Sequence, residues 1–253
     1  MDNLNTAQFI GTVRLDFDTL PSTNTFAAEL LSEQKTPEGT IIVAKHQSAG
    51  RGQLSKSWES EKGKNITISI ILYPTFLSPS EHTLLNQTIA LGVHDFISSF
   101  VKKYISIKWP NDIMAGENKI AGLLLQNSLQ GEQIQHSVAG IGININQTVF
   151  HSAERPTSAA LETGQFFNVE ELIPRLCHFL EARYTRLRDR HYAQINADYH
   201  NLLYRRGEWK QYCATVDGQN FTAKLLGITT EGKLKLETAE GVLHYNLHEI
   251  RFI

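Results

Sequence analysis

The chain has 253 residues, 41% of them hydrophobic, and carries 24 basic against 26 acidic side chains, a formal net charge of −2. This composition is typical of a globular protein with a sizeable core, and without a basic excess it argues against a general nucleic-acid-binding protein. No apolar run approaches the roughly 20 residues of a membrane-spanning helix, and no signal peptide is recognisable, so we expect a cytoplasmic protein without membrane contact. The distant Cys177 and Cys213 predict buried thiols rather than a disulfide or a zinc site.

Strand and helix patterns alternate over the first 150 residues. Runs rich in β-branched residues predict strands at residues 13–17, 41–44, 65–73, 104–108, 119–129 and 134–143. A helical pattern begins at Ser22, which suits a helix cap, and a second helix is expected over residues 80–100. Together these elements predict an α+β fold, with one mixed β-sheet flanked by helices.

The second half of the chain predicts one long helix followed by short strands. Residues 168–198 keep a helical pattern throughout, with Pro174 expected in the first turn, where proline is tolerated. After Gly207, short alternating strands are separated by Asp-Gly and Glu-Gly pairs, which is typical of a small antiparallel β-barrel. We therefore expect a larger domain over residues 1–205 and an SH3-like β-barrel over residues 206–253.

Residues 50–58, GRGQLSKSW, combine two glycines, two cations and an indole. Glycine lets the backbone approach a ligand closely, and the N–H groups of such a loop can turn toward phosphate oxygens. The pattern matches neither the P-loop nor the dinucleotide-binding motif, so a surface turn is an equally good interpretation of it when it is taken alone.

Three more motifs follow in order: KWPNDI at residues 108–113, KIAGLL at 119–124 and GIGIN at 140–144. In this order and spacing the four motifs resemble the catalytic domain of biotin protein ligases, and the resemblance extends over residues 21–146. It implies a class II synthetase-like catalytic domain that converts biotin and MgATP to biotinyl-5′-AMP and pyrophosphate. A lysine of a biotin carboxyl carrier domain then takes the biotin and releases AMP. Because the motifs begin so early, the monofunctional form without an N-terminal DNA-binding domain is expected.

The resemblance also implies three catalytic residues. Lys119 would contact the biotin carboxylate and the α-phosphate, and Arg51 would clamp the phosphates through its guanidinium group. Asp112 would orient the reacting groups or a Mg²⁺ ion, which proteins usually hold through few side chains together with substrate phosphates. No other metal ligand is assigned.

Further positions are implied for the two substrates. The biotin-binding positions are Ser22, Thr23, Asn24, Gln47, Gly50, Arg51, Gly52, Lys119, Gly122 and Leu123. The nucleotide-binding positions are Arg51, Lys56, Trp58, Asn111, Asp112, Lys119, Asn144 and Arg251. The polar members suit the ureido group of biotin, whose donors and acceptor need partners once they are buried. Plainer interpretations remain for Ser22 as a helix cap, Lys56 as a solvated lysine and Trp58 as a core anchor.

Two other functions stay open. A lipoate or octanoate protein ligase would share the fold and the lysine, although the chain lacks that group's Arg-Arg-x-Ser-Gly-Gly-Gly pattern. A non-catalytic nucleic-acid-binding module could use the barrel and the helical stripe of Arg183, Arg186 and Arg190, but the net charge favours no DNA partner. A homodimer is left open as well.

The loop departs from many biotin protein ligases at two positions. They read Gly-Arg-Gly-Arg, whereas this chain has Gln53 in place of the second arginine and Ser55 where glycine is common. Glutamine can donate a hydrogen bond but brings no charge, so we expect weaker retention of the adenylate.

Overall fold

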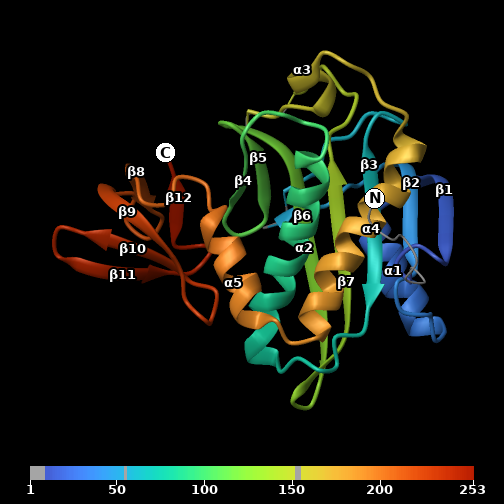
Figure 1. Cartoon of the computed structure of the whole chain (residues 1–253), viewed down its shortest axis with the longest axis horizontal. Coiled ribbons are helices and arrows are strands. Elements are labelled where there is room, and N and C mark those ends of the chain that lie inside the picture. Colours follow the sequence, from blue (N-terminus) through green and yellow to red (C-terminus); the bar gives the residue numbers. More distant parts are fainter. Residues whose placement is uncertain (1–8, 54–55, 152–154) are drawn as a thin grey trace.

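The computed structural model describes residues 9–53, 56–151 and 155–253, and its centre is a seven-stranded sheet (Figure 1). Strand order is β1-β2-β3-β7-β6-β5-β4, with β1 and β2 parallel and the other neighbours antiparallel. The strands are β1 (Arg14–Leu20), β2 (Ile41–Gln47), β3 (Ile66–Leu72), β4 (Ile105–Lys108), β5 (Asp112–Ala115), β6 (Asn118–Gln130) and β7 (Gln133–Ile143). The predicted mixed sheet is confirmed, and β5, which was not predicted, begins within the motif at residues 108–113.

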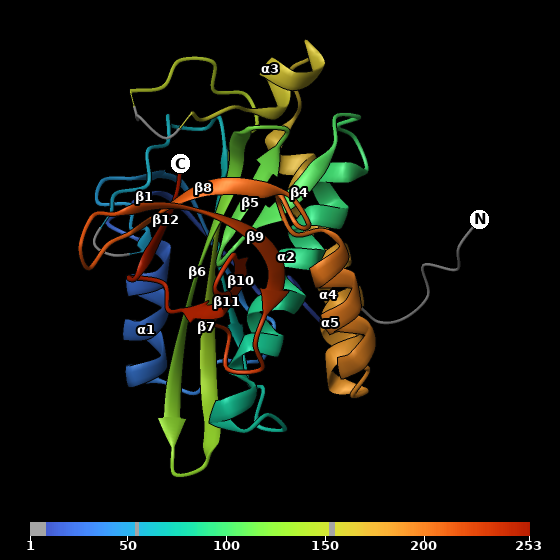
Figure 2. The same cartoon turned by 90° about the vertical axis from the view of Figure 1, so that its left-hand side faces the viewer.

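Helices cover the two faces of this sheet unequally. Figure 2 shows α1 (Thr23–Glu33) on one side, and α2 (His82–Ser98), α4 (Val169–Arg188) and α5 (Tyr192–Asn201) on the other. The α2 and α4 side encloses the main core, to which β3 contributes every second residue: Ile66, Ile68 and Ile70 are all buried there. A smaller apolar cluster lies under α1. On the α1 side, β5 and β6 line the pocket described below.

The helical segments differ from the sequence-based expectation in four details. A 3₁₀ turn, η2 (Pro79–Glu81), precedes α2, and a capping box of Ser78 and Glu81 opens it. The expected single helix over residues 168–198 is wrong, because Arg190 adopts a left-handed backbone conformation (φ 61°) that separates α4 from α5. Pro174 does not lie in the first turn, since α4 begins at Val169. A short helix, α3 (Ala159–Thr163), was not expected.

A second sheet of five antiparallel strands lies beside β4 and β5 (Figure 1). Its strands are β8 (Trp209–Ala214), β9 (Asn220–Ile228), β10 (Leu234–Thr238), β11 (Gly241–Tyr245) and β12 (Ile250–Phe252), in the order β11-β10-β9-β8-β12. The expected turn glycines Gly218, Gly232 and Gly241 have positive φ angles, which glycine tolerates best. The fold class is confirmed, but no strand pairing in the described chain closes this sheet into a barrel.

The two sheets share buried contacts. Tyr212 and Leu225 of the second sheet belong to the same core cluster as Ile107 of β4. The proposed division at residues 205 and 206 therefore stays a prediction. Both cysteines are buried and unpaired, as expected, and burial raises the pKa of Cys177 to about 11. No helix within the described ranges is long and apolar enough to cross a membrane. Ser55 lies outside the described residues.

Candidate active site

A row of small residues crosses the α1-side face of the seven-stranded sheet. Gly122 of β6 pairs with Gly142 of β7, and Asp112 of β5 pairs with Gly122 on its other side. The Trp58 indole lies against these glycines: a Cβ atom at Gly142 would come within 2.4 Å of the ring, and one at Gly122 within 3.0 Å. Glycine is therefore required at Gly142 for the indole to rest on the sheet, and the two motif glycines form a groove.

A β-bulge aims Lys119 into this groove. The register between β5 and β6 runs from Ile113 opposite Ala121 to Met114 opposite Lys119, so Ile120 is an extra residue in β6. Without the bulge, strand alternation would place Lys119 on the same face as Ala121, under α2 and α4. Bulges redirect side chains in this way near many functional sites. Here the bulge places Lys119 on the face that carries Asp112.

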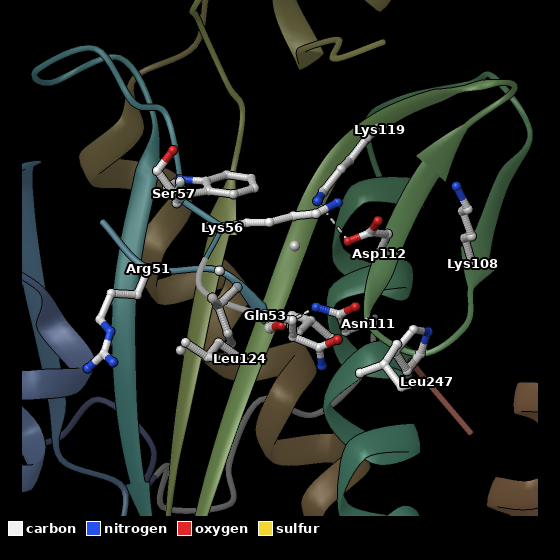
Figure 3. A pocket seen from close by; sticks show the side chains of 18 of the residues that line it. Arg51, Gln53, Lys56, Ser57, Lys108, Asn111, Asp112, Lys119, Leu124 and Leu247 are labelled. Carbon is white, nitrogen blue, oxygen red and sulfur yellow. Dashed lines mark hydrogen bonds and ion pairs between the residues drawn. The ribbon is translucent and has the colours of Figure 1, made fainter. Parts of the chain in front are cut away.

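Lys119 and Asp112 form the central ion pair of the site. Lys119 Nζ lies 2.9 Å from Asp112 Oδ1, and the two side chains are only 18% and 21% exposed. The ammonium group also lies 5.7 Å from the centre of a Trp58 ring, within the range of a cation–π contact. The Lys56 side chain points toward the same pair (Figure 3). Two ammonium groups thus approach one carboxylate.

A hydrogen-bonded set of polar side chains lies at the start of α1. Gln47 Oε1 accepts from the N–H of Thr23 at 2.8 Å and from its hydroxyl at 3.1 Å. Asn24 donates both amide protons, to the Leu124 carbonyl at 3.0 Å and to Gln126 Oε1 at 3.1 Å. The fully buried Ser69 hydroxyl lies 2.6 Å from Asn24 Oδ1 and 2.7 Å from Thr23 Oγ1.

These bonds decide which groups can receive a ligand. Asn24 has its donors engaged, and a Cβ atom at Gly140 would come within 2.3 Å of its Oδ1, so this residue holds α1 against β6 and β7. Gln47 uses its oxygen internally, and its NH₂ group has no hydrogen bond to another described residue. An amide NH₂ donates two hydrogen bonds, so Gln47 suits a ligand carbonyl.

One cavity of about 460 Å³ contains both the ion pair and this polar set. Its described lining includes five cationic side chains, Arg51, Lys56, Lys108, Lys119 and Arg251, and one carboxylate, that of Asp112. The second sheet supplies part of the wall through Thr215, Leu247, His248, Ile250, Arg251 and Phe252. In a chain of net charge −2, this local excess of positive charge favours an anionic ligand.

A neighbouring cavity of about 520 Å³ shares Ser57, Trp58 and Lys119 with the first. Asn144 lines this neighbouring cavity and is not among the residues of the first. Asn144 is only 3% exposed, and its Oδ1 has no hydrogen-bond partner in the described chain, while its Nδ2 donates to the Thr157 carbonyl at 2.9 Å. Phe150 lies in the same cavity. An unused acceptor beside an aromatic ring suits a planar group that carries N–H donors.

The structure brings most sequence-predicted residues to the two cavities. The first is lined by Ser22, Thr23, Asn24, Gln47, Arg51, Gly52, Lys56, Trp58, Asn111, Asp112, Lys119, Gly122, Leu123 and Arg251, and the second by Asn144. Gly50 lies just outside, where a Cβ atom would come within 2.6 Å of the Trp58 carbonyl oxygen. The Leu123 side chain belongs to the core, and Leu124, in register with Gly140, lies on the pocket face instead.

Arg51 has an exposed side chain whose guanidinium group points away from Lys119 and Asp112 (Figure 3). The loop itself is closed by two backbone hydrogen bonds, from Gly52 N–H to the Lys56 carbonyl at 2.7 Å and from Trp58 N–H to the Gly50 carbonyl at 2.9 Å. The arginine is therefore at the pocket entrance in this conformation, not on the central ion pair.

Sequence reasoning missed Ser69 and Gln126, which hold the polar set together. Ser69 lies in a strand pattern that contains no motif, and Gln126 follows the KIAGLL motif on the same strand, so only the sheet register brings them to Asn24. The alternation of Ser69 with the buried Ile68 and Ile70 was the one available signal, since it predicts that Ser69 faces away from the core.

Comparison with known proteins identifies relatives over most of the chain. A family model described as the biotin/lipoate A/B protein ligase family matches residues 17–144. A bifunctional ligase/repressor BirA from Bacillus spizizenii is 32% identical over 233 residues, covering 89% of this chain and 69% of that protein. A biotin--[acetyl-CoA-carboxylase] ligase from Paracoccus denitrificans is 31% identical over 144 residues, covering 53% of this chain and 58% of that one.

Solved structures share the fold. A biotin protein ligase from Aquifex aeolicus, in complex with biotin and ATP, superposes with a TM-score of 0.78 at 23% identity. The match covers 96% of this chain and all of that one, so it includes both sheets.

Proposed function

The chain belongs to the biotin/lipoate A/B protein ligase family, and we propose that its pocket is the active site of a biotin--protein ligase. The enzyme activates biotin with MgATP to biotinyl-5′-AMP and transfers the biotin to a lysine of a biotin carboxyl carrier domain. The observation that carries this proposal is one cavity with two unlike ends. Five cationic side chains and a single carboxylate line the cavity, and neutral hydrogen-bonding groups over an apolar floor form its other end.

In the first half-reaction, a biotin carboxylate oxygen attacks the α-phosphorus of ATP, and the bond to the β-phosphate oxygen breaks. Both reactants are anions, so the site must supply positive charge where they meet. Lys119 does so, because the bulge and the 2.9 Å contact with Asp112 fix its ammonium group inside the groove. Lys56 adds a second positive charge beside it (Figure 3).

The remaining nucleotide positions suit the rest of ATP. Arg51 and Arg251 line the cavity and can pair with phosphate oxygens through their guanidinium groups. Asn111 lies beside Asp112, and its Nδ2 donates to the Leu123 carbonyl at 2.5 Å, which fixes the orientation of its amide. Asn144 offers its unused Oδ1 to an exocyclic amine of the base in the second cavity, where Phe150 provides a ring for stacking.

Biotin fits the other end of the cavity. Its ureido carbonyl needs a donor, which the Gln47 NH₂ supplies, and its apolar ring needs a surface such as Leu124 and the Trp58 indole. Ser22 and Thr23 hydroxyl groups lie at the same end, although Ser22 also caps α1 through the Thr25 N–H. Gly122 allows the ligand carboxylate to reach Lys119.

Magnesium would enter with the triphosphate. The described residues contain no cluster of three or more metal-ligating side chains, and Asp112 is the one carboxylate among the described residues of the cavity. This set fits Mg²⁺, which is commonly held by one or two carboxylates together with substrate phosphates and water. The bound ion would neutralise charge on the triphosphate, with Asp112 as its protein ligand.

In the second half-reaction, the carrier lysine amine attacks the acyl carbon of biotinyl-5′-AMP. The acyl carbon–oxygen bond to AMP breaks, AMP leaves with the electron pair, and the amine loses a proton as the amide forms. Until then the adenylate must be kept from water, which the loop at the Arg51 end of the cavity is placed to do. The carrier domain stays a prediction, and a homodimer stays open.

Biotin-dependent exchange of labelled pyrophosphate into ATP tests the first half-reaction directly. We expect exchange with biotin and not with lipoate or octanoate, since the polar set at α1 suits a ureido group and lipoate has none. Transfer of labelled biotin to a purified carrier domain then tests the second half-reaction. Exchange supported by lipoate alone would refute the proposal in favour of the related ligases.

A further inference from the structure

The turn between β4 and β5 carries Asn111 and leads directly to Asp112. On one side, this turn is bound to β6: the Leu123 N–H donates to the Asn111 carbonyl at 2.9 Å, and Asn111 Nδ2 donates to the Leu123 carbonyl at 2.5 Å. These bonds fix one edge of the turn within the seven-stranded sheet. The other edge of the turn, at Trp109, is held by different contacts.

Trp109 connects that edge to the second sheet. Its side chain is buried, with 7% of the residue exposed, and its indole N–H donates to the Gly232 carbonyl at 2.9 Å. Gly232 lies in the turn between β9 and β10, at a positive φ of 83°. The acceptor is therefore a backbone oxygen of a segment that belongs to the other sheet.

The β9–β10 turn is itself held against α2. Thr83 Oγ1 donates to the Thr230 carbonyl at 3.1 Å. A Cβ atom at Gly232 would come within 2.6 Å of Thr83 Cγ2, so the turn and the helix are in close contact. The Gly232 carbonyl is thus a fixed acceptor, anchored independently of Trp109.

We propose that Trp109 is a positioning residue for the reaction: by holding the β4–β5 turn to the second sheet, it sets where Asp112 meets Lys119. The inference rests on the proposed function. Asp112 lies three residues after Trp109 and contacts Lys119 Nζ at 2.9 Å, so a shift of the turn would change this contact. Displacement of a reacting group by about 1 Å can cost on the order of 100-fold in rate, so a small shift is measurable.

A role in packing alone would require the ring but not the N–H. Replacing Trp109 with phenylalanine keeps an aromatic ring, removes the donor and leaves the Gly232 carbonyl without its buried partner. We expect Trp109→Phe to lower kcat for biotin-dependent pyrophosphate exchange about tenfold, with KM for biotin changed less than twofold, because the biotin end of the cavity lies on α1 and β2. Trp209→Phe, which alters a half-exposed tryptophan on β8, is the matched control and should leave kcat unchanged.

Thr83→Val provides a second test that does not touch the indole. It keeps the side-chain shape and removes the hydroxyl that holds the β9–β10 turn, so kcat should fall in the same direction by about threefold, again without a rise in KM for biotin. This variant decides the question if Trp109→Phe does not fold. Unchanged kcat in a folded Trp109→Phe, or in Thr83→Val where that variant alone folds, would overturn the proposal. Wild-type enzyme that shows no biotin-dependent exchange would instead refute the proposed function.

Discussion

The two faces of the seven-stranded sheet are built from the same strands for opposite purposes. On β7, Ile141 and Ile143 belong to the core under α2 and α4, while Gly140 and Gly142, which alternate with them, face the pocket. On β3, the buried isoleucines alternate in the same way with Ser69. Neighbouring residues on one strand therefore have different roles. Substitution on the core face should change the stability of the fold, and substitution on the pocket face should change ligand binding and reaction rate.

Charge differs between the faces as well. On the face covered by α2, α4 and α5, Arg183 forms two ion pairs within the fold. Its Nε lies 2.6 Å from Asp95 Oδ2, and its Nη1 lies 2.5 Å from Asp198 Oδ2. Arg183 is therefore not available as part of the helical stripe considered for nucleic acid, although Arg186 and Arg190 are exposed. On the pocket side, five cationic side chains and one carboxylate line the cavity. The ion pairs of Arg183 stabilise the fold, whereas the cations that line the pocket favour binding of an anionic substrate.

The largest effect on the pocket face should come from Lys119. Lys119→Ala removes the ammonium group that stabilises the reacting anions, so adenylate formation should slow by about 100- to 1,000-fold, as loss of one such electrostatic contact does in other enzymes. The melting temperature should stay near that of the wild type, because the side chain lines the cavity and is not part of the apolar core. Stopped-flow or single-turnover formation of labelled adenylate measures the rate. Lys35→Ala, at an exposed lysine, is the control. Near-normal biotin-dependent pyrophosphate exchange by folded Lys119→Ala would show that Lys119 does not stabilise the reacting anions.

How Lys119 reaches the site shows what the sequence can and cannot predict. Alternating apolar residues predicted β3, β6 and β7, and the motif resemblance indicated Lys119, Asp112 and Gly122. The bulge at Ile120 was not predictable, because nothing in KIAGLL marks an extra residue, and strict alternation would have placed Lys119 in the core.

The polar set was only partly predictable for a related reason. The family resemblance indicated Thr23 and Asn24, but Ser69 and Gln126 reach them through strand register across 45 or more residues of sequence. The break between α4 and α5 was not predicted, because the apolar pattern continues across Arg190. The left-handed backbone conformation of this residue cannot be inferred from the spacing of apolar residues.

Adjacent residues on β7 provide the sharpest test of the two-face comparison. Gly142→Ala adds a Cβ atom within 2.4 Å of the Trp58 ring, so the indole must move, and KM for biotin or ATP should rise about tenfold from a strain of roughly 1–3 kcal/mol. Ile141→Val, one residue away, should lower the free energy of unfolding by about 1 kcal/mol and leave both KM values unchanged. Urea unfolding and steady-state exchange measure the two quantities. The comparison fails if Ile141→Val alters KM more than Gly142→Ala does.

The ion pairs on the face covered by α2, α4 and α5 should make the free energy of unfolding depend on pH. The contacts with His94 and Arg183 outweigh the opposing effect of burial and lower the pKa of Asp95 below its ordinary value. A lowered carboxyl pKa in the folded state stabilises the protein above the unfolded-state pKa of about 3.9, and that contribution is lost as pH falls through the folded-state value. Asp95→Asn should therefore cost about 1 kcal/mol at pH 7, measured by urea unfolding, and progressively less below about pH 4. Asp18→Asn, which breaks only surface pairs with Lys45 and Lys62, should show little effect; an equal loss of stability there would contradict the distinction.

The smallest expected effect concerns the loop at the cationic end. Gln53 lines both the main cavity and an adjoining one, in the position where many biotin protein ligases have a second arginine. Gln53→Arg would bring a sixth cation to a cavity that has five, and partly solvated charges a few ångströms apart interact by about 1 kcal/mol. We therefore expect biotinyl-5′-AMP to dissociate about fivefold more slowly, measured by chasing labelled intermediate with unlabelled biotin and ATP. Gln53→Met, of similar size and without charge or amide, separates the effect of charge from that of shape. Release that is unchanged or faster in Gln53→Arg would mean that Lys56 and the other cations already supply all the positive charge that the adenylate can use.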